Sequence, residues 1–434
     1  MRTLIRACLI LSLSLMPVLA RAQSADGSVP APSNIPSGQF PRVNADKTVT
    51  FRVRADTATT VSINGLSENY PMTRGQDGFW MATTKPLPPG FYYYTVNVDG
   101  FTGADFGSRA YFGWNRWGSA LEVPGEESAF FAIRDVPHGA VRMQWYFSPS
   151  TGKWRRIMVY TPPGYDTDTR TRYPVLYLQH GAGEDETGWT NQGHAQFILD
   201  NLIADKKARP MIIVNDHGVV PPSPSASARQ APADAGRGTA PDAGRGTTAD
   251  GGRGTATAAA RGATADAGRG ATPDAGRGAA QAAQAGRGSG NTFAEFDRIV
   301  SRELVPFIDK TFRTKADRDN RALAGLSMGG SQAFRIGLNH LDLFGSILVL
   351  SSGLGPIDTA TDYNGVLKDA AAFNKRLRLL WLGVGTADNA HPRLKQVHET
   401  LEKAGIKHVW VESAGGHVWT EWRKYLAQFA PLLF

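Results

Sequence analysis

Residues 322–330, Ala-Leu-Ala-Gly-Leu-Ser-Met-Gly-Gly, are the part of the sequence that is most informative about the fold. Its centre is the pattern Gly-x-Ser-x-Gly around Ser327, with an apolar run before it and a helix-compatible run at 331–338 after it. A serine on a tight strand-to-helix turn holds its hydroxyl clear of a sheet, and its neighbours must be small because the helix folds back close to the strand. A structural glycine turn is the alternative, but the flanking runs favour a nucleophile at Ser327.

Other compact apolar runs precede and follow this stretch. They alternate with helical patterns, such as the apolar spacing across 293–308. Such runs are typical of strands buried on both faces of a parallel sheet, so the sequence predicts an α/β fold. The strands are expected at 157–160, 175–178, 211–214, 322–326, 347–350, 379–384 and 409–411.

A serine hydroxyl is a poor nucleophile unless a base accepts its proton. His417 follows the last predicted strand and a Gly-Gly pair, where such a base is expected. Asp388 follows the strand before it, in position to orient the imidazole and stabilise its charged form. The chain order Ser327, Asp388, His417 is that of the α/β-hydrolase triad. His180 and His217 also end predicted strands, but catalytic use of either would break this order.

A tetrahedral intermediate needs two backbone N–H donors, which form an oxyanion hole. The amide of Met328, at the start of the helix after the serine, is one candidate. The second is expected in the loop after the strand at 175–178, where His-Gly-Ala-Gly occupies 180–183. Small residues there let the backbone approach a substrate, and Gly181 and Ala182 both remain candidates.

Residues 41–125 contain short runs of β-branched and aromatic residues without a helical pattern. Asp-Gly turns at 77–78 and 99–100 separate some of them. Several short strands joined in this way predict a small immunoglobulin-like β-sandwich. Its strands are expected at 48–53, 61–63, 79–83 and 91–98. Residues 23–40 are rich in Pro, Ser and Gly and are expected to form a linker.

The first 22 residues have the pattern of a secretory signal peptide. Arg2 and Arg6 precede an apolar stretch, and Ala-Arg-Ala at 20–22 fits a cleavage site. The apolar stretch is too short for a membrane anchor, so the protein is expected in the periplasm or outside the cell. Cleavage would remove Cys8, the one cysteine, and leave no disulfide and no cysteine nucleophile.

Apart from proline, residues 221–290 have no apolar side chain larger than that of alanine, and Arg-Gly recurs there every eight residues from 237 to 277. Such a segment cannot bury enough apolar surface to offset its ordering entropy, so we expect a disordered insert. A tether for anionic polysaccharide is the alternative. The formal net charge is +8, but three arginines lie in the signal peptide and the insert has eight Arg against five Asp. The remainder is nearly balanced and does not indicate a nucleic-acid surface.

Four motifs resemble the putative-esterase family, which includes feruloyl and acetyl-xylan esterases and enterochelin esterases. They are His-Gly at 180–181, the stretch 189–203, Gly-Leu-Ser-Met-Gly-Gly at 325–330 and Gly-His-Val-Trp at 416–419. The resemblance extends from about Val136 to the C-terminus without the insert, and the last two motifs are its most specific part. The run at 87–94 resembles the early-set sandwich of the glycogen-binding type.

The resemblance implies an exported carboxylic-ester hydrolase that releases feruloyl or acetyl groups from plant cell-wall polysaccharide. No metal or organic cofactor and no nucleic-acid or membrane partner is expected. Trp189 and Trp419 are candidate walls for an acyl group, with ordinary core packing as the alternative. A siderophore lactone would suit the same site, and a non-catalytic carbohydrate-binding protein on this scaffold is the rival from another class. The domains expected are a signal peptide (1–22), linker (23–40), sandwich (41–125) and α/β-hydrolase domain (126–434), interrupted by the insert (221–290).

Overall fold

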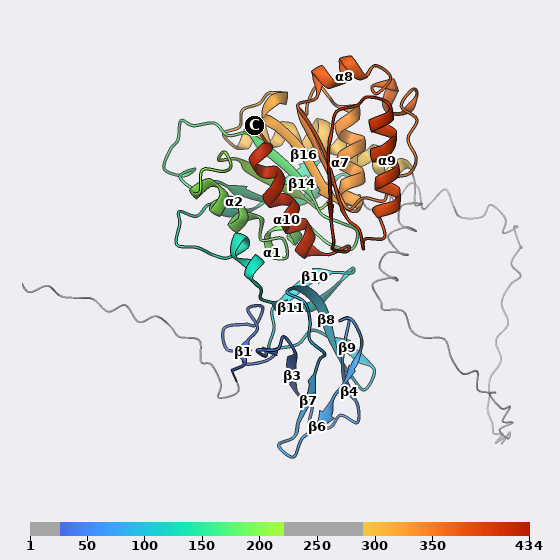
Figure 1. The fold of residues 1–434 in the computed structure, drawn as a ribbon. Helices are drawn as coiled ribbons and strands as arrows, with labels where there is room; N and C mark the ends of the chain where they lie inside the picture. Colours follow the sequence, from blue (N-terminus) through green and yellow to red (C-terminus); the bar gives the residue numbers. More distant parts are fainter. Residues whose placement is uncertain (1–26, 221–289) are drawn as a thin grey trace, which may run out of the picture.

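The computed structural model describes residues 27–220 and 290–434 (Figure 1). The expected signal peptide, Cys8 and the expected insert up to residue 289 lie outside the described residues. In the part of the chain that is described, no helix is both long and apolar enough to cross a membrane.

Two antiparallel sheets form a β-sandwich at the N-terminal end of the described chain. Phe51 and Tyr94, from opposite sheets, meet edge to face in its core with ring centroids 5.0 Å apart. One sheet has the order β1 (Val29–Pro30), β2 (Arg42–Val43), β3 (Val49–Arg54), β7 (Phe79–Thr83), β6 (Thr73–Arg74). The other has the order β10 (Ala110–Gly113), β11 (Arg116–Val123), β8 (Gly90–Val98), β4 (Val61–Asn64), β5 (Tyr70–Pro71), with β9 (Phe101–Gly103) paired to β8.

The segment expected as a linker packs onto this sandwich instead, so that prediction is wrong for residues 27–40. Val29–Pro30 pairs with β2, and Ser33 and Asn34 are buried. The Asn34 amide donates to the Pro41 carbonyl at 3.0 Å. Pro, Ser and Gly do indicate irregular backbone, but side-chain hydrogen bonds to the backbone let such a segment pack without a regular ladder.

An eight-stranded sheet forms the second part of the chain. Its order is β12 (Ala140–Ser148), β13 (Lys153–Thr161), β15 (Ile212–Asp216), β14 (Val175–Gln179), β16 (Arg321–Leu326), β17 (Ser346–Leu350), β18 (Leu379–Gly385), β19 (Val409–Ser413). The strands from β15 to β19 are parallel, as predicted. The prediction is wrong for the strand at 157–160, because β13 is antiparallel to β12 and β15. A four-residue turn joins β12 to β13, and parallel neighbours would need a long crossover.

Helices cover both faces of this sheet (Figure 1). Successive strand residues point to opposite faces, so Leu176 packs with the helices at 195–204 and 419–429, whereas Tyr177 packs with those at 290–311 and 328–339. The first face carries α1 (Gly188–Asn191), α2 (Ala195–Ala204) and α10 (Trp419–Phe429). The second carries α5 (Gly290–Ile299), a π-helical turn (Val300–Leu304), α6 (Val305–Thr311), α7 (Met328–Asn339), α8 (Ala370–Arg376) and α9 (His391–Lys403). The helix expected at 293–308 is therefore present, with a π-helical turn inside it.

The sandwich and the α/β domain share a buried interface. Arg423 on α10 is 1% exposed and donates to both carboxylate oxygens of Glu122 on β11, at 2.8 and 3.0 Å. Phe91 and Tyr111 of the sandwich belong to the same apolar core as Trp419. The sandwich therefore covers an apolar surface next to α10.

Candidate active site

Ser327 lies on a strained turn between β16 and α7. Its φ of 53° and ψ of −115° are unusual for a residue with a side chain. Its N–H donates to the Leu350 carbonyl at 2.8 Å, which ties the turn to β17. A Cβ at Gly325 would lie 2.3 Å from the Gly329 backbone, and one at Gly329 would lie 2.5 Å from the His180 carbonyl oxygen. Glycine is therefore required at both positions flanking the serine.

The loops after β18 and β19 bring Asp388 and His417 into contact. The imidazole Nδ1 of His417 lies 3.0 Å from each carboxylate oxygen of Asp388. The Asp388 side chain is fully buried and also accepts the Ala390 N–H at 2.7 Å, whereas the His417 side chain is 32% exposed. Trp422 on α10 meets the imidazole edge to face, with ring centroids 5.0 Å apart. Because Nδ1 faces the carboxylate, Nε2 is the nitrogen left for proton transfer.

The predicted nucleophile lies at the same edge of the sheet as this pair. Ser327, Asp388 and His417 follow β16, β18 and β19, which run parallel. The contacts between described residues join Asp388 to His417 and include no hydrogen bond to the Ser327 hydroxyl. Hydrogen bonds between catalytic groups are often long without substrate and tighten when it binds.

The loop after β14 passes directly beside the serine. A Cβ at Gly181 would lie 3.3 Å from the Ser327 Cβ. The Gly181 N–H donates to Glu184 Oε2 at 3.1 Å and is therefore already bound. Among described residues, no hydrogen bond engages the amides of Ala182 and Met328. These two amides fit an oxyanion hole better than that of Gly181.

Trp189 and Trp419 lie in the core of the α/β domain. They are 0% and 2% exposed, and their rings meet edge to face with centroids 5.2 Å apart. Trp189 Nε1 donates to the Gln179 carbonyl at 3.0 Å, and Trp419 Nε1 donates to Glu184 at 2.8 Å. Neither indole offers a face to an acyl group, so the expectation of apolar walls does not hold here and the alternative, core packing, describes both residues.

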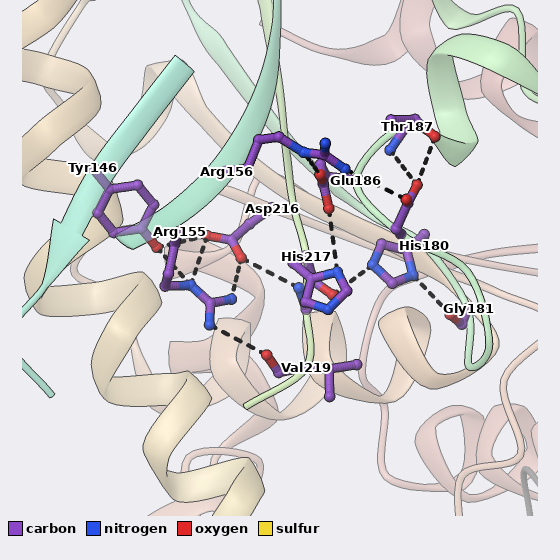
Figure 2. Close-up of polar contacts among 12 residues, drawn as sticks. Tyr146, Arg155, Arg156, His180, Gly181, Glu186, Thr187, Asp216, His217 and Val219 are labelled. Atoms are coloured by element: carbon purple, nitrogen blue, oxygen red, sulfur yellow. Dashed lines mark hydrogen bonds and ion pairs between the residues drawn. The ribbon is translucent and has the colours of Figure 1, made fainter. Parts of the chain in front are cut away.

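His180 and His217, the two other histidines at strand ends, belong to a polar network (Figure 2). His180 is buried, and its ring nitrogens lie 2.7 Å from the Gly181 carbonyl oxygen and 2.6 Å from that of His217. Burial lowers the pKa of His180. Because the ring is buried between these two carbonyl oxygens, His180 lies between the Gly181 loop and the loop after β15 and is not presented to a substrate.

Two ion pairs connect these loops to β13 (Figure 2). Arg155 pairs with the buried Asp216, and Arg156 pairs with Glu186. Burial alone would raise the pKa of Glu186, but hydrogen bonds from His217 and Arg156 lower it to about 2. Despite these charged groups, residues 27–220 and 290–434 contain no cluster of three or more His, Cys, Asp or Glu suited to a metal ion.

Three residues that are not predicted from the sequence contact the loop beside Ser327. Glu184 binds the Gly181 amide, Tyr93 of the sandwich lies next to Glu184, and the Asn115 N–H donates to the Gly183 carbonyl at 2.9 Å. The sequence contains one indication of the role of Glu184, because this residue stands three residues after Gly181 in a glycine-rich loop. The sequence contains no such indication for the two sandwich residues, because their contacts depend on how the two domains pack.

Comparison with known proteins extends these observations. The family model described as "Putative esterase" matches residues 148–248 and 266–433. An endo-1,4-beta-xylanase/feruloyl esterase from Xylanibacter ruminicola is 34% identical over 415 residues, which are 94% of this chain and 47% of that protein. An acetyl esterase from Caldicellulosiruptor saccharolyticus is 28% identical over 162 residues, 30% of this chain and 61% of that protein. The chain thus spans about half the length of the first relative and under two thirds of the second.

Solved structures agree on the fold. The enterobactin esterase from Shigella flexneri superposes with a TM-score of 0.55 at 16% identity, covering 88% of this chain and 92% of that one. A ferulic acid esterase from Anaeromyces mucronatus gives a TM-score of 0.50 at 19% identity, covering 72% and 96%. The family model covers well over half of the chain, including the serine elbow and the His417 loop. The chain therefore belongs to the putative-esterase family, as an α/β-hydrolase domain preceded by a β-sandwich.

Proposed function

We propose that this protein is a serine carboxylic-ester hydrolase, with Ser327 as nucleophile, His417 as base and Asp388 as the acid that orients it. The observation that supports this most is the position of the Asp388 carboxylate. It contacts both the loop backbone and His417 Nδ1, at the sheet edge that carries the strained Ser327. A carboxylate held in this way fixes the imidazole tautomer and stabilises the imidazolium that forms.

The reaction follows from this arrangement. Ser327 Oγ attacks the ester carbonyl while His417 Nε2 takes the hydroxyl proton. The negative oxygen of the tetrahedral intermediate lies between the amides of Ala182 and Met328. His417 then gives its proton to the leaving alcohol, which departs and leaves an acyl group on Ser327. Water, activated by the same imidazole, releases the acid.

We propose acyl groups on plant cell-wall polysaccharide, feruloyl or acetyl, as the substrates. The names of the two relatives support this, since one is a xylanase/feruloyl esterase and the other an acetyl esterase. A siderophore lactone is the second candidate, because the fold extends over most of an enterobactin esterase. Methyl ferulate, acetylated xylan and enterobactin, compared by kcat/KM, separate these substrates, and a preference for enterobactin would overturn the polysaccharide proposal.

We also propose that the protein acts in the periplasm or outside the cell, from the signal-peptide pattern at 1–22. Sequencing the N-terminus of protein recovered from an expressing bacterial culture tests this, with a start at residue 23 expected. Recovery of uncleaved protein from the cytoplasm would contradict it.

Labelling with a fluorophosphonate distinguishes the enzyme from a non-catalytic binding protein on the same scaffold. The probe phosphonylates an activated serine and should modify wild-type protein at Ser327. Ser331 is a matched control because it lies one helical turn away, where its hydroxyl is 2.7 Å from that of Ser352. Labelling should therefore disappear in Ser327→Ala and persist in Ser331→Ala. Wild-type protein that neither labels nor hydrolyses any ester would favour the binding protein.

A further inference from the structure

The Glu184 carboxylate is buried beside the proposed site and takes no part in the reaction described above. Glu184 is 8% exposed. Its Oε2 accepts the Gly181 N–H at 3.1 Å, and its Oε1 accepts Trp419 Nε1–H at 2.8 Å. The Tyr93 hydroxyl lies 3.5 Å from Oε1. A buried charge without partners is very costly, so these donors explain how the carboxylate is kept there.

The two oxygens bind two different parts of the proposed site. Gly181 immediately precedes Ala182, the proposed oxyanion donor, and lies against the Ser327 side chain. Trp419 is the first residue of α10 and lies two residues after His417. The carboxylate therefore bridges the backbone that carries the oxyanion donor and the helix start that follows the base.

The side chains that donate hydrogen bonds to Glu184 are themselves held in place by their neighbours. The Trp419 indole packs edge to face on Trp189 and Trp422, and Trp422 packs in the same way on the His417 imidazole. Gln192 Nε2 donates to the Tyr93 hydroxyl at 2.8 Å. A shift of Glu184 would therefore be transmitted to the imidazole ring through packed aromatic rings, as well as to the Gly181 backbone.

We propose that Glu184 is a positioning residue of the esterase site, which sets the oxyanion loop relative to His417 by binding the Gly181 amide and the Trp419 indole together. The inference rests on the function proposed above and adds a residue to it. Occupying the Gly181 amide also leaves the Ala182 amide as the loop donor that can turn to a substrate. Glu184 touches no reacting atom, so its effect is on geometry and on the charge around the base.

Besides its two hydrogen bonds, Glu184 affects the proposed site through its charge. Burial raises the pKa of Glu184 to about 7, and the hydrogen bonds from the Gly181 amide and the Trp419 indole, together with the nearby His417, partly offset this rise. When it is ionised, Glu184 adds negative charge near the imidazolium that forms during acylation. An amide in its place would keep the size of the side chain and remove this charge.

The test compares Glu184→Gln with Glu186→Gln, a buried carboxyl two residues later that binds Arg156 and His217 rather than Gly181 or Trp419. Turnover of 4-nitrophenyl acetate, the fluorophosphonate labelling rate and Tm are measured for each. A glutamine can accept only one of the two N–H groups and turns its own N–H₂ toward the other. We expect kcat and the labelling rate to fall about 10- to 100-fold in Glu184→Gln, because small misplacements of catalytic groups have effects of this size. KM should stay within about threefold, and Glu186→Gln should keep kcat within about threefold.

Trp419→Phe supplies a second test that keeps an aromatic ring in the core, although a smaller one, and removes the indole N–H that Glu184 binds. Alone it should lower kcat by a few-fold. Combined with Glu184→Gln it should restore part of the lost kcat, because the glutamine oxygen can then bind Gly181 while its N–H₂ no longer faces the indole N–H and can donate to the Tyr93 hydroxyl oxygen. A purely structural role predicts the opposite, since two core substitutions would lower Tm and the active fraction further.

The outcomes separate this inference from the proposed function. Equal kcat in wild-type protein, Glu184→Gln and Trp419→Phe would overturn the positioning role and leave the esterase assignment intact. An equal fall in Glu184→Gln and Glu186→Gln, or a double variant worse than either single one, would also overturn it. If Glu184→Gln does not fold, the test rests on the kcat of Trp419→Phe. A kcat equal to that of the wild-type protein would then contradict the inference. A wild-type protein without labelling or turnover would overturn the proposed function and this inference with it.

Discussion

At the scale of single residues, the proposed triad makes the strongest prediction. Ser327→Ala and His417→Ala should each lower kcat by on the order of 10⁶-fold, as in serine proteases whose nucleophile or base is removed. Asp388→Asn should cost less, because it changes the imidazole tautomer but leaves nucleophile and base in place. Turnover of 4-nitrophenyl acetate measures each loss. Near-wild-type rates in Ser327→Ala would exclude the mechanism, whereas a silent Asp388→Asn would exclude only the acid.

Glu184 also makes a prediction about stability and pH. Burial raises its pKa from 4.5 to about 7, so the folded protein binds this proton more tightly than the unfolded chain. The resulting stabilisation is complete below pH 4.5 and is lost as the pH rises through about 7. Relative to Glu184→Gln, the wild-type free energy of unfolding should fall by about 3 kcal/mol between pH 4.5 and 8. Urea unfolding of both proteins at the two pH values measures this, and a pH-independent difference would contradict it.

The sequence predicts residues whose role depends on local turns and chain order. Ser327, Asp388 and His417 follow strands that are recognisable as apolar runs, and parallel strands bring such loops to one edge. The role of Glu184 is not predictable in this way, because a Glu in a glycine-rich loop is usually solvated. Its burial depends on Trp419, 235 residues further along the chain, and on Tyr93 of another domain. The role of Trp189 likewise depends on its burial, because a single sequence does not show whether an indole lies in the core or lines a binding surface.

At the scale of secondary structure, buried parallel strands are found close to where they are predicted, because both of their faces are apolar. β12 is not predicted from the sequence, because its apolar residues do not mark its buried face. Its outward residues Met143, Trp145 and Phe147 are 59%, 48% and 50% exposed, whereas its inward face includes Tyr146 and Ser148. Alternation of apolar residues therefore gives no guide to which side is buried. The antiparallel direction of β13 follows from its short turn to β12, which apolar content does not reveal.

The insert gives the prediction at this scale. We expect replacement of residues 222–289 by a short Gly-Ser linker to leave turnover of 4-nitrophenyl acetate within a few-fold of wild type. The segment has no large apolar side chain, and long insertions in surface loops cost little free energy. Tm should change by only a few degrees. A folded deletion variant whose turnover collapses would show that the insert helps to build the site.

At the scale of the whole molecule, the sandwich is proposed to act mainly as a cover for the α/β domain. It supplies none of the proposed catalytic residues, and its Phe91 and Tyr111 share a core with Trp419. Removing Glu122 would leave the buried Arg423 without its carboxylate, and loss of one partner of such a pair typically costs 3–5 kcal/mol. The alternative is that the sandwich holds the site against a polymeric substrate.

A truncation that begins at Glu126 tests the two roles. If the sandwich is a cover, the fragment should be insoluble or have a much lower Tm, and turnover of small esters and release from insoluble xylan should fall together. Small-ester turnover that survives while release from xylan falls would favour substrate binding instead. A soluble fragment equally active on both substrates would contradict both roles.

The hydrogen bond from the Asn115 N–H to the Gly183 carbonyl has a consequence for the evolution of this architecture. Trp114 and Asn115 form the tight turn between β10 and β11, both with positive φ, so an insertion or deletion there would move the loop beside Ser327. Such a turn in a freely exchangeable module would be expected to vary in length. We therefore expect a chimaera that joins this α/β domain to a sandwich from a distant relative to inherit a displaced loop along with the new module.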